Sequence, residues 1–324
     1  GGGGGPTDPV SASLVGYWPG DGDGFGDQLS NVAESTNGID RELHGTLNNA
    51  TWTTDDGGHT GLPGDFAFDV TGEATSYVEV PFTGKDFQEI TITGWVNGVQ
   101  TGDWTGLIQA RGGDDQPIGI GIRAGTGELA YTWNDNNANS YNFVSGLAVP
   151  ADDWTFVALT VTPDRAVLYV GADGALNSAV NEIAHLVQSN PTTSWFFGKD
   201  NCCGDARNWD GLMDDISIWD SALSEDELQS LFDGTHTPAT LPHEGGGGPG
   251  GEAPVITGKV TWTEAGTIAF PISGAPGTTF DVEYSTDLIE WEPIATGLTG
   301  DVMFEDDDVD RLANPDGYYR GHTK

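Results

Sequence analysis

Basic side chains are scarce in this sequence. Lysine and arginine together number 11 among 324 residues, against 50 aspartates and glutamates, and the formal net charge is −39. A protein that grips DNA or RNA through its phosphate groups needs many Lys and Arg side chains to replace condensed counterions. Anionic membrane surfaces attract the same basic groups. The shortage therefore argues against nucleic acid and against anionic membranes as partners.

Long hydrophobic runs are also missing. No stretch approaches the roughly 18 apolar residues of a membrane-spanning helix, and no apolar core of a signal peptide is found. We therefore expect no membrane insertion. The chain begins with Gly1–Gly5 rather than with methionine. We expect it to be a processed piece of a longer exported precursor, located outside the cell or on its surface.

Cysteine occurs only twice, at the adjacent positions Cys202 and Cys203. Neighbouring Cα atoms across a trans peptide are about 3.8 Å apart, which is below the usual disulfide range, so a bridge between them needs a distorted ring. In an exported protein we favour this vicinal disulfide over two free thiols, and a bridge between two molecules is a third alternative. A redox enzyme is less expected, because the C-x-x-C pattern is lacking.

Glycine, by contrast, is abundant. It supplies 49 of the 324 residues, roughly twice its average share. Clusters of glycine, aspartate, asparagine and proline separate short runs of alternating or β-branched residues, a pattern typical of an all-β sandwich. Period-two alternation predicts strands at residues 76–82, 90–96, 154–161 and 166–170.

One helix is expected near the end of the first domain. Ser224 and Glu227 form a capping-box pattern ahead of Leu228 and Leu231, and Gly234 stands where a left-handed C-terminal cap belongs. A helix of about two turns is marginal alone, so we expect it to pack its leucine face on the sandwich.

Composition divides the chain into four parts. Residues 1–9 form a Gly/Pro-rich tail, 10–234 a first all-β domain, 235–254 a Gly/Pro-rich linker, and 255–324 a small β-sandwich module. In the last part, strands are expected at 260–262, 267–272, 279–284 and 317–320.

Several motifs occur in order in the first domain. They are Leu14–Asp21, His44–Leu47, Phe66–Asp69, Tyr77–Pro81, Asp153–Thr160 and Gly211–Trp219. With these motifs, residues 10–234 resemble the laminin G-like, concanavalin A-like lectin domains of bacterial secreted proteins, which implies a jelly-roll domain of two antiparallel sheets. The C-terminal module resembles small β-modules of secreted proteins from planctomycete-like bacteria.

Four aspartates suggest a calcium site. Asp21 and Asp23 follow the first predicted strand, and Asp214 and Asp215 lie on the last one of the domain. The first and last strands of a jelly-roll are usually neighbours, and clustered carboxylates suit Ca²⁺, which the family often binds there. The alternative is ordinary turn chemistry, with acids that meet by chance in a chain of 50.

Aromatic residues outside the apolar runs suggest a carbohydrate surface. Trp104 and Trp209, with Asn134 and Asn136 between them in sequence, lie among polar residues and could stack on and hydrogen-bond to a sugar. The alternative is that tryptophans fill the sandwich core, which we favour for Trp133 and Trp195.

Catalytic signatures are lacking, so we expect no enzyme. We find no E-x-D-x-x-E, H-E-x-x-H or G-x-S-x-G pattern. The leading hypothesis is a secreted adhesion or structural protein whose lectin-like domain contacts copies of itself, building a surface or extracellular filament. The alternative is a calcium-dependent carbohydrate-binding module that binds extracellular polysaccharide, and a glycan hydrolase is a distant third.

Overall fold

The computed structural model divides the chain into two compact units, Gly1–Gly245 and Gly246–Lys324. Each unit is described by itself. The structure describes residues 13–21, 26–33, 43–81, 86–102, 104–112, 115–123, 125–133, 138–187, 194–202, 207–243, 255–256, 261–263, 267–273, 279–286, 292–312 and 318–323.

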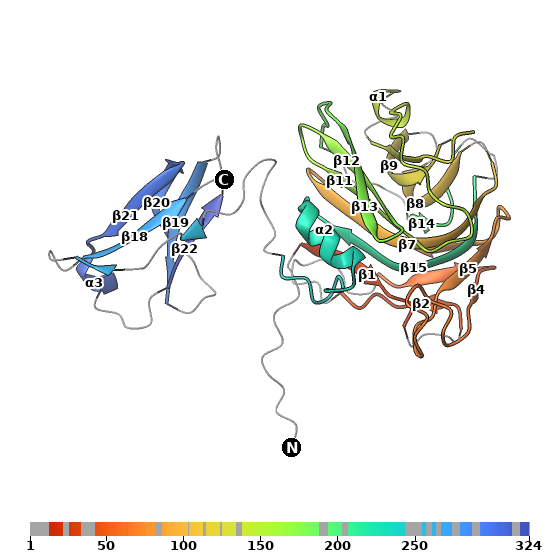
Figure 1. The fold of residues 1–324 in the computed structure, drawn as a ribbon, viewed down its shortest axis with the longest axis horizontal. Coiled ribbons are helices and arrows are strands. Elements are labelled where there is room, and N and C mark those ends of the chain that lie inside the picture. Colours follow the sequence, from red (N-terminus) through yellow and green to blue (C-terminus); the bar gives the residue numbers. More distant parts are fainter. Residues whose placement is uncertain are drawn as a thin grey trace, which may run out of the picture. The chain divides into compact units, whose positions relative to one another are not determined.

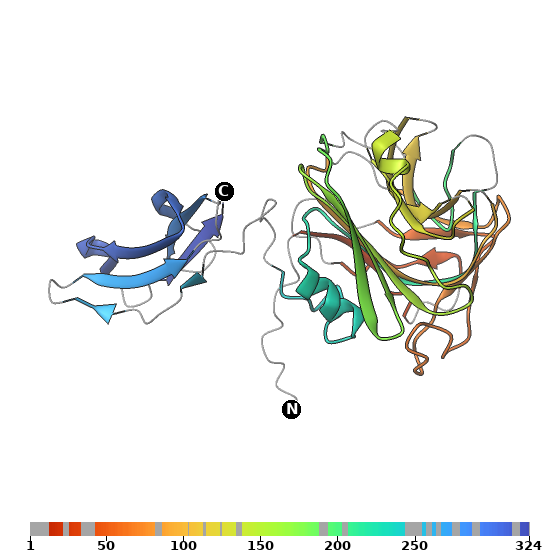
Figure 2. The same ribbon diagram turned by 45° about the horizontal axis from the view of Figure 1, so that its top comes forward.

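The first unit consists of two antiparallel sheets that face each other (Figures 1 and 2). This confirms the predicted all-β sandwich. Sheet A has eight strands: β1 (Leu14–Trp18), β4 (Thr51–Trp52), β5 (Phe68–Thr71), β7 (Ile90–Gln100), β11 (Thr155–Val161), β12 (Ala166–Ala172), β13 (Ala175–Asn181) and β15 (Trp209–Trp219). Sheet B has seven: β2 (Gln28–Leu29), β3 (Gly45–Asn48), β6 (Tyr77–Val80), β8 (Thr105–Gly112), β9 (Asp115–Ile122), β10 (Leu129–Thr132) and β14 (Trp195–Phe197). A single helical turn, α1 (Ala138–Tyr141), follows β10.

The main core lies between the two sheets. Alternate residues of each strand point into it, as Val78 and Val80 of β6 do with no exposed surface. Trp133 and Trp195 belong to this core, as the alternative interpretation of these residues held. Trp209 belongs to it as well and is only 2% exposed.

Helix α2 (Glu225–Phe232) covers the other face of sheet A. Ser224 is its N-cap and forms the predicted capping box with Glu227, and Gly234 has the left-handed φ of 72° expected just beyond the end of the helix. Leu228 and Leu231 are buried in a second apolar cluster with Phe156, Tyr169 and Trp219. Because both faces of sheet A are covered here, β11 is buried along its entire length.

The first and last strands of this sandwich are hydrogen-bonded neighbours. Strand β1 pairs antiparallel with β15, with Trp18 opposite Ile216. The loop that follows β1 is therefore brought to the middle of β15, where Asp214 and Asp215 lie. This pairing is the arrangement on which the predicted calcium site depends.

The second unit has a four-stranded and a three-stranded sheet. Its small core includes Phe270, Ile272, Phe280 and Val282. No helix among the described residues of either unit is long and apolar enough to cross a membrane. The four-stranded sheet comprises β16 (Val255–Ile256), β17 (Thr261–Trp262), β18 (Ile268–Ser273) and β21 (Asp301–Asp306), the three-stranded sheet comprises β19 (Thr279–Ser285), β20 (Glu292–Thr299) and β22 (Tyr318–Thr323), and α3 is Val309–Leu312.

Candidate functional site

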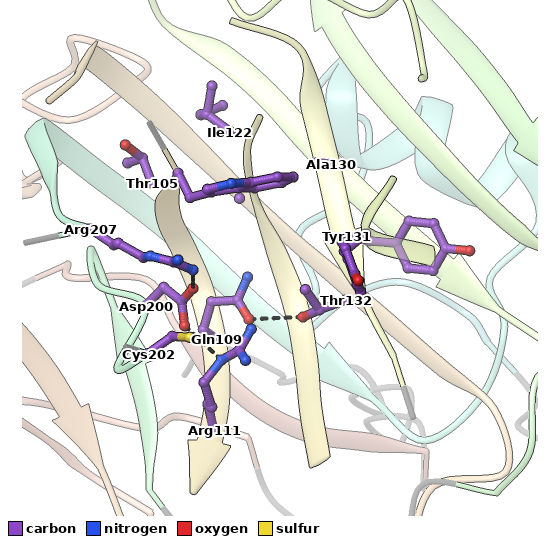
Figure 3. Close-up of a pocket in the computed structure, with 13 residues that line it drawn as sticks. Thr105, Gln109, Arg111, Ile122, Ala130, Tyr131, Thr132, Asp200, Cys202 and Arg207 are labelled. Carbon is purple, nitrogen blue, oxygen red and sulfur yellow. Dashed lines mark hydrogen bonds and ion pairs between the residues drawn. The ribbon is translucent and has the colours of Figure 1, made fainter. Parts of the chain in front are cut away.

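A pocket of about 370 Å³ lies on the face of sheet B that points away from the core (Figure 3). Along β8, Ile108 and Ala110 point into the core, so the intervening Gln109 and the following Arg111 point outward into the pocket. The same alternation places Thr132 of β10 there. We call this cavity the sheet B pocket. Its lining residues are Trp104, Thr105, Gln109, Arg111, Gly121, Ile122, Ala130, Tyr131, Thr132, Tyr141, Asp200, Cys202 and Arg207.

Close backbone packing forms part of the pocket's wall. A Cβ atom on Gly121 would lie 2.3 Å from the carbonyl oxygen of Thr105, and one on Gly106 would lie 2.2 Å from the backbone nitrogen of Asp200. Glycine is therefore required where β9 approaches β8 and where the segment carrying Asp200 crosses β8. This close approach brings Asp200 beside the outward side chains of β8.

Two arginines share one carboxylate in the sheet B pocket. Arg111 Nε lies 2.8 Å from Asp200 Oδ1, and Arg207 Nη1 donates a hydrogen bond of 3.1 Å to Asp200 Oδ2. Arg111 and Asp200 are buried, with 3% and 5% of their surfaces exposed, while Arg207 is half-buried. Because each carboxylate oxygen contacts a different guanidinium, the trio keeps an excess of one positive charge.

Neutral polar groups complete the pocket. The Thr132 hydroxyl donates a 3.1 Å hydrogen bond to Gln109 Oε1, as Figure 3 shows. The Thr105 hydroxyl is buried and has no hydrogen-bond partner among the residues that the structure describes. A buried donor without a partner is costly, so it marks a place where a ligand or water can bind.

The ligand-binding residues predicted from sequence have different outcomes. Trp104 lines the pocket and is half-buried, so part of it is open to the cavity. Trp209 does not line it; its place in the core corrects the expectation that it offers a face to a ligand. Asn134 and Asn136 lie outside the described residues.

One of the two cysteines of the predicted vicinal disulfide lies at the same pocket. Cys202 is buried, lines the sheet B pocket and is disulfide-bonded. Its neighbour Cys203 lies outside the described residues, so the vicinal pairing stays a prediction.

A second group of titratable side chains lies over sheet A, and we call it the acidic corner: Asp21, His59, Asp65, Asp214 and Asp215. His59 Nδ1 lies 2.9 Å from Asp214 Oδ2 and 3.5 Å from Asp215 Oδ2. The Tyr17 hydroxyl donates a 2.5 Å hydrogen bond to Asp215 Oδ1. The charge of Asp214 also acts on Asp21. Three of the four predicted calcium ligands are therefore gathered here, and Asp23 lies outside the described residues.

An irregularity in β15 brings the two neighbouring aspartates to one histidine. Successive side chains of a regular strand point to opposite faces. Here the register against β7 shifts between Asp214 and Ser217, and Asp215 has a left-handed φ of 48°. This local bulge allows both carboxylates to reach His59.

Burial and mutual repulsion hold protons on these carboxyl groups. Burial and then the charge of Asp214 raise the pKa of Asp215 to about 7 and that of Asp21 to about 6. Burial also raises the pKa of Asp214. For His59, burial favours the neutral ring, but the hydrogen bond to Asp214 and the nearby negative charges outweigh it, so the pKa lies above its ordinary value.

The acidic corner opens into a second pocket of about 380 Å³. Its lining includes Tyr17, Asp21, Asp65, Asp215, Trp95 and Phe156. The His59 ring stacks on Trp95 with 4.5 Å between centroids. Sequence reasoning missed His59, because it belongs to no metal-binding spacing and reaches the corner only through the loop before β5.

Two facing antiparallel sheets, with the first and last strands as neighbours, give the first unit a jelly-roll sandwich fold. Residues 71–229 match the family model Laminin_G_3, described as the concanavalin A-like lectin/glucanases superfamily. This match confirms, over the matched residues, the resemblance drawn from the sequence motifs.

Solved structures with a similar fold have low sequence identity. Domain 4 of AbnA, an extracellular arabinanase from Geobacillus stearothermophilus crystallised with arabinotriose, has a TM-score of 0.49 and 17% identity, with 68% of this chain and 98% of that chain covered. Trypanosoma rangeli sialidase bound to the inhibitor DANA has a TM-score of 0.46 and 15% identity, with 68% and 32% covered. The binding domain of Paraclostridial Mosquitocidal Protein 1 has a TM-score of 0.46 and 14% identity, with 92% and 72% covered. No curated protein sequence matches the chain.

Proposed function

We propose that the first unit is a non-catalytic, lectin-like module that binds carbohydrate in the sheet B pocket. The observation that carries this proposal is the combination of aromatic side chains, Trp104 and Tyr141, with hydrogen-bonding groups around one cavity of about 370 Å³. Sugars present both a C–H face that packs on aromatic rings and hydroxyl groups that need donors and acceptors. The sheet B pocket offers both kinds of contact.

Binding without hydrolysis is favoured by the state of Asp200. Glycoside hydrolysis usually requires two carboxyl groups on opposite sides of the scissile bond. Among the residues that line the sheet B pocket, Asp200 is the one carboxylate, and both of its oxygens are engaged by arginines. It is therefore poorly placed to act as an acid or a nucleophile.

Adhesion, self-assembly and an extracellular location stay predictions from the sequence. A lectin-type fold is compatible with all three but distinguishes none of them.

Substitution of Trp104 with alanine tests the proposed site. We expect about a 10-fold loss of affinity for the bound saccharide, since a stacking contact is worth roughly 1.4 kcal/mol. The saccharide is first found on an array of neutral and acidic glycans, and the affinity is then measured by isothermal titration calorimetry. Trp154→Ala is the matched control, because Trp154 is equally half-buried and does not line the pocket. Equal losses in both variants, or no bound glycan at all, would contradict the proposal.

We also propose that the acidic corner holds a Ca²⁺ ion through the carboxylate oxygens of Asp21, Asp214 and Asp215. Calcium prefers oxygen ligands, and these aspartates supply them at one place. The raised pKa values of Asp21 and Asp215 support the proposal, because burial and the neighbouring charge of Asp214 disfavour their ionised forms and a bound cation would favour them. The ring nitrogen of His59 is not a ligand that calcium favours, so the fitting set is the carboxylates.

Calcium is therefore expected to raise the melting temperature of the protein. An ion that binds the native state alone adds about 2.7 kcal/mol of stability when its concentration is 100 times the dissociation constant. The measurement is a thermal melt in EDTA and in millimolar CaCl₂, with Asp214→Asn as a variant in which the response should shrink. If EDTA and calcium give the same midpoint for the parent protein, calcium has no structural role here.

A further inference from the structure

We propose that the sheet B pocket selects an acidic saccharide, whose carboxylate or sulfate group is bound by Arg111 and Arg207. This inference rests on the proposed carbohydrate-binding function and adds the chemical class of the ligand.

The distribution of charge is the first argument. The chain has a net charge of −39 and only 11 basic side chains, yet two of them line this one pocket. Elsewhere the protein has a large surplus of carboxylates with which arginines could pair. Among the described residues that line the pocket, however, Arg111 and Arg207 share Asp200 as their one carboxylate. A local excess of positive charge within an acidic protein would attract and hold an anionic group.

The burial of Arg111 is the second argument. Only 3% of its side-chain surface is exposed, and Figure 3 shows its guanidinium near Asp200 and Gln109. Asp200 is its ion-pair partner, through Nε. Within the described part of the chain, no other protein group satisfies its two terminal nitrogens. A buried guanidinium with free donors is costly unless something else satisfies them.

The geometry of the contacts is the third argument. A single carboxylate can pair with a guanidinium through two parallel hydrogen bonds. Asp200 instead gives one oxygen to each arginine. Each guanidinium therefore retains an edge that can bind a second oxyanion, and the planar arginine fork suits a carboxylate or a sulfate.

The neutral lining fits the remainder of such a ligand. The Thr105 hydroxyl, which has no partner among the described residues, and the Gln109 amide can form hydrogen bonds with hydroxyl groups of the sugar. Trp104 can pack on the face of the sugar ring. The pocket therefore combines an anion-binding end with a sugar-binding wall. Neutral saccharides can use only the second part.

The test compares acidic and neutral saccharides of equal length. Calorimetric titrations of the full chain use oligogalacturonate, a sulfated galactan oligosaccharide and the neutral galactan oligosaccharide. We expect at least a 10-fold higher affinity for an acidic ligand than for the neutral one, and a smaller difference at high salt. The carboxylated and sulfated ligands show which of the two anionic groups is preferred.

Arg207→Gln is the informative variant, because Arg207 is half-buried and its loss is easier to accommodate than that of Arg111. We expect it to lower the affinity for the acidic ligand by at least 10-fold and so to reduce the ratio of the acidic to the neutral affinity. Arg165→Gln removes the same charge from an exposed position outside the pocket and should have no effect. Thermal melts confirm that both variants are folded.

The outcomes separate this inference from the function on which it rests. If neutral and acidic ligands bind equally, and Arg207→Gln changes neither affinity, selection of acidic saccharides is overturned while carbohydrate binding stands. If Arg165→Gln weakens binding as much as Arg207→Gln does, the effect is one of overall charge and the inference also fails. If no saccharide binds, the proposed function fails as well.

Discussion

Substitution of Asp200 with alanine is expected to lower the free energy of unfolding of the first unit by about 3–5 kcal/mol. Asp200 is the carboxylate shared by Arg111 and Arg207, and both Asp200 and Arg111 are buried. Its removal leaves a guanidinium charge in a poorly solvated place with no compensating partner. An effect of this size is a large fraction of the total stability of a typical domain.

Urea unfolding followed by tryptophan fluorescence measures this loss as a lower midpoint with an unchanged slope. Asp153→Ala is the matched control, because Asp153 is exposed. The double variant Asp200→Ala/Arg111→Met should recover part of the loss, since it also removes the unpaired charge. A single variant that is as stable as the control would show that the ion pairs contribute nothing, and would weaken the case for a charged pocket.

The metal-free protein is expected to be more stable at pH 5 than at pH 8. The pKa of Asp215 is raised to about 7 in the folded state and that of Asp21 to about 6, while both are ordinary carboxyl groups when the chain is unfolded. At pH values between the unfolded and the folded pKa of each carboxyl group, the folded protein binds more protons than the unfolded chain. The free energy of unfolding therefore falls as the pH rises through this range. The raised pKa of His59 acts in the same direction, because its protonated form is favoured below the folded pKa.

A fall in melting temperature of about 5–10 °C from pH 5 to pH 8, measured in EDTA, is the expected size for a domain of this length. Asp215→Asn should flatten the profile, because an amide cannot ionise. Acid also stabilises a chain of net charge −39 in general, because protonation of its carboxylates weakens their mutual repulsion. The variant distinguishes this general effect from the effect of the acidic corner. If the melting temperatures of the parent and the variant fall equally with pH, groups other than Asp215 cause the pH dependence.

The sheets and the helix could be predicted because their signals are local. Strand β11 was expected at 154–161 and runs from Thr155 to Val161, since its β-branched and aromatic residues mark it directly. The capping box of α2 and the glycine beyond it are likewise contained within eleven residues of sequence. The pairing of the first and last strands followed from the jelly-roll topology rather than from any one residue.

The sheet B pocket could be predicted only in part, because its charged residues are distant in sequence. Arg111 is on β8, and Asp200 follows β14, which pairs with β8. No local pattern connects them. The alternation of Gln109 and Arg111 with apolar residues along β8 is a signal that could have predicted an outward-facing polar site on this strand. Trp209 was misassigned for a related reason. Its polar neighbours suggest a loop, but Asp210 is an exposed residue of β15 and Asn208 is itself buried.

The two glycines at the pocket wall have a consequence for how this binding site can change. At Gly106 and Gly121 any larger residue would collide with backbone, so these positions cannot contribute new side chains to ligand recognition. Changes of ligand preference are therefore expected to come from substitutions at the outward positions of β8 and β10 and at Trp104 and Arg207. Attempts to redirect the site to another ligand should randomise those positions and keep both glycines fixed.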